Sequence, residues 1–253
     1  MKNLLIYINP YHRFNPEHKA MLEVQIDNSL NYWRKEDILL VTNFPYEYNG
    51  VKATVVWDNL ISKTFYVYPR GIINSEVNVI VYLLENKIIN ELTWVHDFDA
   101  FQVSPFDFTV IKKDLAMTDY GIYPPNKLQS LKGTFNPRIN FGSIFFKPAS
   151  LDIFKLMLER INKDNLYAED ATTLMIKEDN NIRERIQMLN QAYNFGIRCH
   201  SDNFKIAERP LKVVHFPPDN PRWLHKFRTL ISSQLNSLID EKFTNIHQLN
   251  QAV

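Results

Sequence analysis

The chain has 253 residues, of which 45% are hydrophobic and 23% are charged. These values exclude a disordered, collagen-like or disulfide-framework protein, and the length approaches the upper size of one hydrophobic core. Lys plus Arg number 29 against 28 Asp plus Glu, so the molecule lacks the net positive charge that attracts nucleic acid non-specifically.

The single cysteine and the apolar runs bear on the compartment. Cys199 has no second cysteine to pair with, which favours a reducing compartment and a buried thiol. The run 4–8 is too short for a signal-peptide core or a membrane span, and no other run approaches 18 apolar residues. We therefore expect a soluble, cytoplasmic protein.

Strand-like and helix-like patterns alternate along the first hundred residues. In chain order they predict a strand at 4–8, a helix at 17–33, strands at 38–41 and 51–57, a helix from the N-cap residues Asn74-Ser75 to Ile88, and a strand at 92–95. Such alternation predicts a Rossmann-like α/β fold, with a mixed, mostly parallel central sheet flanked by helices.

The second half of the chain is less regular. Its pattern predicts a strand at 139–146, a helix at 151–161, a helical region from 168 into the 180s, a strand at 211–216 and an amphipathic helix at 223–239. No repeat or linker interrupts the chain, so we expect one domain, 1–253. It would comprise a nucleotide-binding half at 1–100, an acceptor half at 101–223 and a helical extension at 224–253.

The triplet Asp97-Phe98-Asp99 follows the strand predicted at 92–95. Ligands of such folds sit beyond the carboxyl ends of strands, and paired carboxylates suit a hard divalent cation. The chain has only 6 Gly and no Gly-rich phosphate loop, so a bound cation is an alternative way to hold a diphosphate. Trp94, Phe98 and Phe101 could line a binding site for a base or a sugar. A solvated turn after a strand is the alternative interpretation of the triplet.

The segment Trp94-Val-His-Asp-Phe-Asp-Ala-Phe resembles the strand plus Asp-x-Asp element of glycosyltransferases with the GT-A fold. Three later segments agree with that family in order. Asn140 and Gly142 match an Asn-x-Gly turn before an acceptor-side strand, and Tyr167-Ala-Glu-Asp-Ala matches an acidic helix start. Val213-Val-His-Phe with Pro-Arg-Trp at 221–223 is similar to the late region of glycogenin-like transferases.

The resemblance implies a role for each matching residue. Asp97, Asp99 and His215 would hold Mn²⁺ or Mg²⁺, and Asp97 would also reach the ribose. Arg222 would lie near the diphosphate, although the family's Lys-Pro order is changed here to Pro-Arg. Asn140 and Gly142 would belong to the cofactor-binding site.

The acidic pair Glu169-Asp170 supplies the catalytic candidates. An inverting enzyme would use one of these carboxylates to deprotonate the acceptor hydroxyl, whereas a retaining enzyme requires no such base. The glycogenin-like His215 favours retention slightly. Acidic residues at a helix start are also favoured by the helix dipole alone, which is the structural alternative.

Three further residues are candidates for donor binding. Asn9 and Tyr11 follow the first strand, where this fold receives the nucleotide base, and Tyr11 could stack on it. Arg70 precedes the helix predicted from Asn74 and could face the donor, or it could be an exposed turn arginine. His96 is expected to point away from Asp97 into the core, because side chains alternate along a strand.

The expected function is therefore metal-dependent transfer of a sugar from a nucleotide-diphosphate sugar, a UDP-sugar in particular, to a hydroxyl of a glycan. An Asp-nucleophile phosphatase fits poorly, because its triplet lies on an early strand. A nucleotidyltransferase needs a Gly-rich loop after its first strand, which 9–13 does not provide. A catalytically silent GT-A-like module that binds glycans or a partner protein stays open as the alternative.

Overall fold

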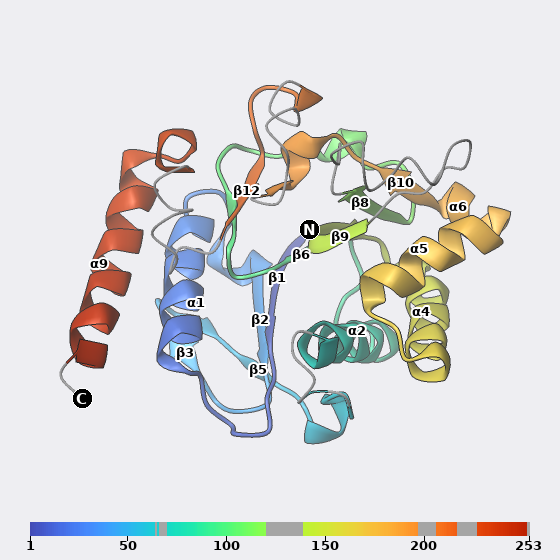
Figure 1. Cartoon of the computed structure of the whole chain (residues 1–253), viewed down its shortest axis with the longest axis horizontal. Helices are drawn as coiled ribbons and strands as arrows, with labels where there is room; N and C mark the ends of the chain where they lie inside the picture. Colours follow the sequence, from blue (N-terminus) through green and yellow to red (C-terminus); the bar gives the residue numbers. More distant parts are fainter. Residues whose placement is uncertain (64, 66–69, 120–138, 197–205, 217–226, 252–253) are drawn as a thin grey trace.

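The computed structural model describes residues 1–63, 65, 70–119, 139–196, 206–216 and 227–251. Its centre is a seven-stranded sheet in the order β10-β8-β9-β6-β1-β2-β5 (Figure 1). The strands are β1 Lys2–Tyr7, β2 Ile38–Thr42, β5 Thr54–Val55, β6 Thr93–His96, β8 Leu115–Asp119, β9 Ile139–Phe146 and β10 Ile186–Met188. All neighbours run parallel except β9, which is antiparallel to both β6 and β8. The predicted fold class, a mixed and mostly parallel sheet, is confirmed.

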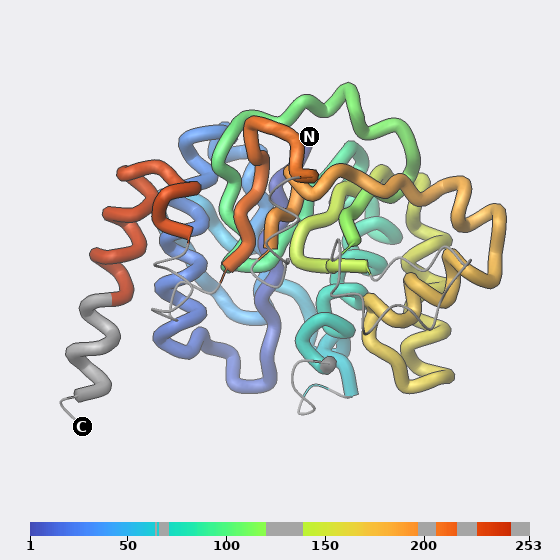
Figure 2. The backbone as a smooth tube through the Cα atoms, turned by 45° about the horizontal axis from the view of Figure 1, so that its top comes forward, coloured from blue at the N-terminus to red at the C-terminus, as the bar shows by residue number. Residues whose placement is uncertain are grey.

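Helices cover both faces of this sheet (Figures 1 and 2). One face carries α1 Pro16–Ser29, against which α9 Ser233–Gln251 packs. The other carries α2 Arg70–Glu85, α4 Leu151–Asp164 and α5 Ala168–Glu178, and α6 Asn180–Arg185 leads into β10. The alternation of side chains along β1 serves both layers: Leu4 packs in the core with α2 and α4, and Leu5 packs in the core with α1.

A second sheet of three short strands lies beside the first. It contains β7 Ala100–Gln102, β11 Phe195–Gly196 and β12 Val213–His215, in the order β11-β12-β7. A hairpin of β3 Glu47–Tyr48 and β4 Val51–Lys52 turns at Asn49-Gly50, both of which have positive φ. Short 3-10 helices complete the described elements: η1 Lys35–Asp37, η2 Asp58–Leu60, η3 Phe108–Val110, η5 Pro148–Ser150, η6 Gln191–Tyr193 and η7 Arg228–Leu230.

Two predicted elements of the first half differ from the structure. The strand predicted at 51–57 is two short pieces, because β4 turns back on β3 before β5 joins β2. The helix predicted from Asn74-Ser75 begins at Arg70. Neither polar residue caps it: the Ser75 hydroxyl donates to the carbonyl of Gly71, and the Asn74 amide donates to the carbonyl of Leu166.

The second half also departs from the prediction in its element boundaries. The helical region from 168 breaks at Asp179, whose carboxylate accepts hydrogen bonds from the N–H groups of Asn181 and Ile182 and caps α6. The C-terminal helix α9 begins at Ser233, later than predicted. Cys199 and residues 217–226, with Arg222, lie outside the described residues. In the ranges given above, no helix has both the length and the apolarity needed to cross a bilayer.

Candidate metal and donor site

The Asp97–Asp99 turn is held by backbone hydrogen bonds with β7, β9 and the residue after β12. It connects β6 to β7, and the N–H of Ala100 donates to the carbonyl of Asp97 at 3.1 Å. The N–H of Asp97 donates to the carbonyl of Gly142 in β9 at 3.1 Å, and the N–H of Phe216 donates to the carbonyl of Asp99 at 2.8 Å. The two aspartates therefore stand where the large and small sheets meet.

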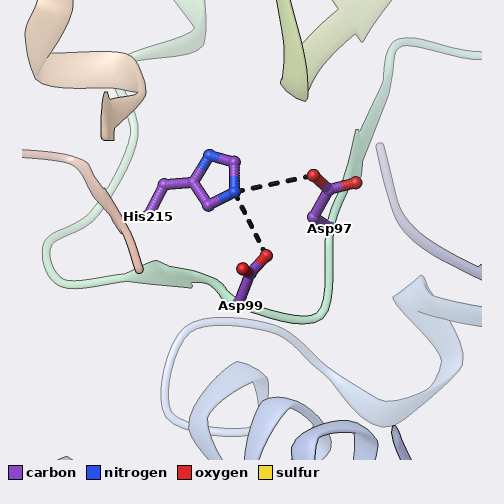
Figure 3. A group of neighbouring side chains, drawn as sticks. All are labelled: Asp97, Asp99 and His215. Carbon is purple, nitrogen blue, oxygen red and sulfur yellow. Dashed lines mark ion pairs between the residues drawn. The ribbon is translucent and has the colours of Figure 1, made fainter. Parts of the chain in front are cut away.

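His215 reaches this turn because β12 pairs antiparallel with β7, which places His215 opposite Ala100. Its Nε2 atom lies 3.1 Å from Oδ1 of Asp99 and 3.5 Å from Oδ2 of Asp97 (Figure 3). One ligand atom of each of the three residues lies within 4.8 Å of the others. The side chains are accessible, with 38% of Asp97, 26% of Asp99 and 16% of His215 exposed. The structure thus brings together the three residues that the sequence nominates as metal ligands.

The spacing of these atoms fits one divalent cation. Ligands of an octahedral ion at about 2.1 Å stand about 3 Å apart when adjacent, close to the 3.1 and 3.5 Å separations from the Nε2 atom of His215. Two carboxylates suit a hard ion, and one imidazole shifts the preference towards a borderline ion such as Mn²⁺. The donor set therefore fits Mn²⁺ or Mg²⁺.

Gly142 makes room for the histidine. A Cβ atom on Gly142 would lie 2.1 Å from Cε1 of His215 and 2.9 Å from Oδ2 of Asp97, so no other residue fits without displacing the imidazole. Asn140 shapes the same segment, because its Oδ1 accepts from the N–H of Gly142 at 2.9 Å. Both residues lie inside β9, at a bulge opposite Met117 and Thr118, rather than in a turn before the strand as the sequence predicted.

Acidic charge is concentrated around this group. Burial raises the pKa of Asp97 to about 6; the charge of His215 opposes the rise, and the charges of Asp99 and Glu169 add to it. Burial also tends to raise the pKa of Asp99. The charge of His215 and its hydrogen bond to Asp99 outweigh this effect, so the pKa of Asp99 lies below its ordinary value. The pKa of Glu76 in α2 is well above its ordinary value because of burial and the charges of both aspartates. The charges of the two aspartates therefore act on Glu76, although no sequence motif singled it out.

The two catalytic candidates differ in their surroundings. Glu169 is half-buried in the first turn of α5, and its carboxylate accepts a hydrogen bond from the N–H of Phe141 at 3.2 Å. It is also close enough to raise the pKa of Asp97. Asp170, the next residue, is exposed. Of the pair, Glu169 is the residue whose charge acts on the metal group.

Two of the donor candidates, Asn9 and Tyr11, lie just beyond the carboxyl end of β1. Asn9 is buried, and its amide group shapes the loop: Nδ2 donates to the carbonyl of Arg13, and Oδ1 accepts from the N–H of Tyr11. Tyr11 follows with 65% of its surface exposed. Arg70 is the first residue of α2, and its side chain lies outside the described part.

The aromatic residues around the triplet do not all line the site. Trp94 and Phe101 are fully buried core residues, so the expectation that they wall a ligand is wrong. Phe98 is only half-buried and stacks on Tyr7 with ring centroids 5.9 Å apart. Phe98 alone of the three keeps a surface towards solvent.

His96 packs in the core, as the alternation of side chains predicts. Its ring stacks on Trp94, and its Nε2 lies 2.8 Å from Oδ1 of Asn3. The Nε2 of Gln25 in α1 lies 2.9 Å from Nδ1 of His96 and donates to the carbonyl of Ala100 at 2.6 Å. Gln25 thus fixes the Asp97–Ala100 turn from behind, and nothing in its local sequence indicates this.

Comparison with solved structures identifies the fold as GT-A. The galactosyltransferase LgtC, in complex with donor and acceptor sugar analogs, aligns with 94% of this chain and 100% of its own at a TM-score of 0.58 and 14% identity. A glycosyltransferase involved in glycosylation of the major capsid of PBCV-1 aligns with 85% of this chain and 93% of its own, at a TM-score of 0.52 and 12% identity. The bifunctional glycosyltransferase WbbM aligns with 95% of this chain and 51% of its own, at a TM-score of 0.56 and 10% identity.

Comparisons at the level of sequence add nothing to this assignment. No protein-family model matches the chain, and no curated protein matches it. The GT-A fold, predicted from four short motifs in order, is confirmed by structure alone.

Proposed function

We propose that this protein is a metal-dependent glycosyltransferase that moves a sugar from a nucleotide-diphosphate sugar, specifically a UDP-sugar, to a hydroxyl of a glycan. The observation that carries the proposal is the convergence of Asp97, Asp99 and His215 at the meeting point of the two sheets. The GT-A fold supports it, because LgtC, which shares that fold, was solved with donor and acceptor sugar analogs.

The roles of the site residues follow from their positions. Asp97, Asp99 and His215 would hold Mn²⁺ or Mg²⁺, which when bound neutralises charge on the departing nucleoside diphosphate. Asn9 and Tyr11 would receive the base, while Arg70 and Arg222 would contribute positive charge at the phosphates. Asn140 and Gly142 keep the histidine ring in place from β9.

The stereochemical outcome is proposed to be retention. Glu169 accepts a backbone hydrogen bond beside the metal group, and Asp170 is exposed; either carboxylate would be the base if the enzyme inverted. The anomeric configuration of the product, read by proton NMR from the first minutes of turnover, distinguishes the two outcomes.

Calorimetric titration with UDP, in the presence and absence of Mn²⁺, tests the proposal. We expect UDP to bind the unmodified protein only with Mn²⁺, and Asp99→Asn to weaken that binding at least about tenfold because one ligand loses its charge. Asp164→Asn on the outer side of α4, where the aspartate pairs only with Arg160 among the described groups, is the matched control and should bind normally.

Each alternative has its own result in the same experiment. Failure to bind any nucleoside diphosphate with either metal would remove the transferase proposal. Metal-dependent UDP binding, without hydrolysis or transfer from any sugar nucleotide, would instead support a catalytically silent binding module.

A further inference from the structure

Asn194 lies directly behind the metal candidate His215. It follows η6 and precedes β11, which pairs in parallel with β12 so that Gly196 lies opposite His215. The Asn194 side chain is completely buried, and its Oδ1 atom lies 3.1 Å from Nδ1 of His215. This contact is on the side of the imidazole opposite to the two aspartates.

The contact determines which ring nitrogen carries the proton. An imidazole that binds a cation through Nε2 needs a lone pair there, so its proton must be on Nδ1. A carboxamide oxygen only accepts hydrogen bonds, so Oδ1 of Asn194 favours the Nδ1–H form of His215. Without a cation, Nε2 carries a proton that it donates to Asp99, and a bound cation would replace that proton. The Nε2 lone pair would then face the space shared with Asp97 and Asp99 while the Nδ1 proton stays on Oδ1 of Asn194.

Asn194 also keeps a feature that stability alone does not favour. Its Nδ2 group is buried without a hydrogen-bond partner in the described structure. A buried donor with no partner destabilises a fold, so such a group is more often found where function requires the other end of the side chain. Here the other end is the Oδ1 atom that contacts the histidine.

We propose that Asn194 is a positioning residue that prepares His215 to bind the cation, by fixing both the tautomer and the orientation of its ring. Gly142 also limits the ring, because a Cβ atom there would overlap Cε1 and Nδ1 of His215. The inference rests on the proposed metal-dependent function, and it concerns a residue that would touch neither donor nor acceptor.

Binding of Mn²⁺ to the full chain, measured by electron paramagnetic resonance of the free ion, tests this role without substrate. We expect Asn194→Leu, of similar size but without an acceptor, to weaken Mn²⁺ binding by about 10- to 100-fold. Asn194→Asp keeps an acceptor oxygen and should restore the affinity to within about threefold of the unmodified protein. The melting temperature of Asn194→Leu should change little, because the unpaired Nδ2 group is removed while the Nδ1–H of His215 loses its acceptor, and these two effects oppose each other.

The matched control is Asn28→Leu, which makes the same change at a buried asparagine that donates to the carbonyl of Gln102. It should lower the melting temperature and leave Mn²⁺ affinity unchanged. Unchanged affinity in Asn194→Leu would overturn the inference and leave the proposed function standing. Absence of Mn²⁺ binding in the unmodified protein would instead refute metal dependence itself.

A second measurement does not depend on how the variants fold. Long-range ¹H–¹⁵N correlation spectra of the unmodified protein saturated with Mg²⁺ report the tautomer of each histidine, and comparison with His215→Gln identifies the resonance of His215. We expect the proton on Nδ1. A proton on Nε2 would overturn the role of Asn194.

Discussion

At the residue scale, Gly142 shows how a missing side chain can be part of a site. We expect Gly142→Ala to weaken Mn²⁺-dependent UDP binding at least about tenfold, because the added Cβ would lie 2.1 Å from the ring of His215 and force it away from the aspartates. Calorimetry measures the loss, and circular dichroism checks that the fold persists.

Ser143→Ala in the same strand is the control, because it removes hydrogen bonds with Trp94 and Tyr193 without adding an atom to the site. Equal losses in both variants would mean that β9 is merely destabilised.

The pKa of Asp97 gives the site a dependence on pH. In the folded protein without a cation, the pKa of Asp97 is raised to about 6. Between the ordinary aspartate pKa and about pH 6, the folded protein therefore keeps a proton on Asp97 that the unfolded chain has lost. The carboxylate therefore destabilises the folded state most fully above about pH 6, where a cation can replace the proton. We expect Mn²⁺ affinity to fall by up to about tenfold per pH unit below about 6, and the rise in melting temperature on adding Mn²⁺ to shrink with it. An affinity unchanged between pH 5 and pH 7, as calorimetry would show, contradicts this.

The residues of the site were predictable from the sequence to different extents. Asp97, Asp99 and His215 stand out because carboxylates and imidazoles bind metals and occur in motifs of known order. Glu76 and Asn194 do not, because their importance comes only from the partners that folding brings beside them. A buried asparagine is indistinguishable in sequence from one in an exposed loop.

At the scale of elements, α9 is attached to α1 by a half-buried ion pair. Lys242 lies 2.9 Å from Glu23 and over the ring of Tyr48, and the hydroxyl of Tyr46 donates to the same carboxylate. We expect Lys242→Met to lower the free energy of unfolding by about 1–2 kcal/mol, because it leaves a largely buried carboxylate without its cation. Urea titration measures this loss, and hydrogen exchange should show faster opening of α9.

The control for that pair is Lys155→Met, which breaks an exposed pair with Glu85 between α4 and α2 and should cost less than about 0.5 kcal/mol. Burial acts to raise the pKa of Glu23, but the hydrogen bond and charge of Lys242 outweigh it, so the pKa lies below its ordinary value. The contribution of the pair to the free energy of unfolding is therefore fully present above the ordinary glutamate pKa. It is lost as the pH falls through the lowered pKa of Glu23 in the folded protein. If Lys242→Met and Lys155→Met cost the same, the attachment of α9 does not depend on this pair.

Elements with strong periodicity were predicted well, and their boundaries less well. The strand at 139–146 matches β9, because eight residues of apolar and small character are buried together. The predicted start of α2 was wrong, because Asn74 and Ser75 are typical helix caps but here lie inside the helix. Their side chains donate hydrogen bonds to the carbonyls of Leu166 and Gly71 instead of capping the helix. Strand β8 was missed because a short segment buried on both faces has no alternation to detect. Strand β10 was missed because it has only three residues.

At the scale of the whole molecule, one sheet joins the two halves that the sequence suggested. Strand β9 from the second half lies between β6 and β8 and pairs with both. We therefore expect one cooperative unfolding transition, with tryptophan fluorescence and far-ultraviolet circular dichroism coincident in urea. A fragment ending at residue 100 should not fold, because β6 would keep β1 but lose β9, its neighbour on the other side. Two separate transitions would contradict a single folding unit.

The fold class was predictable because alternating strands and helices leave few arrangements of a parallel sheet. The reversal of β9 and the small second sheet were not, because they depend on pairings between distant segments. The pairing of β12 with β7 brings His215 to the two aspartates, so the joining of His215 to Asp97 and Asp99 could be predicted only through resemblance to a known family.

The pairing of β12 with β7 has a consequence for the order in which the protein becomes competent during synthesis. A nascent chain that has emerged as far as β9 already carries Asp97, Asp99 and Gly142, but no imidazole to complete the set. Completion waits until β12 leaves the ribosome and finds a strand made more than a hundred residues earlier. The cation that we propose would therefore meet its full ligand set only once β12 has paired with β7.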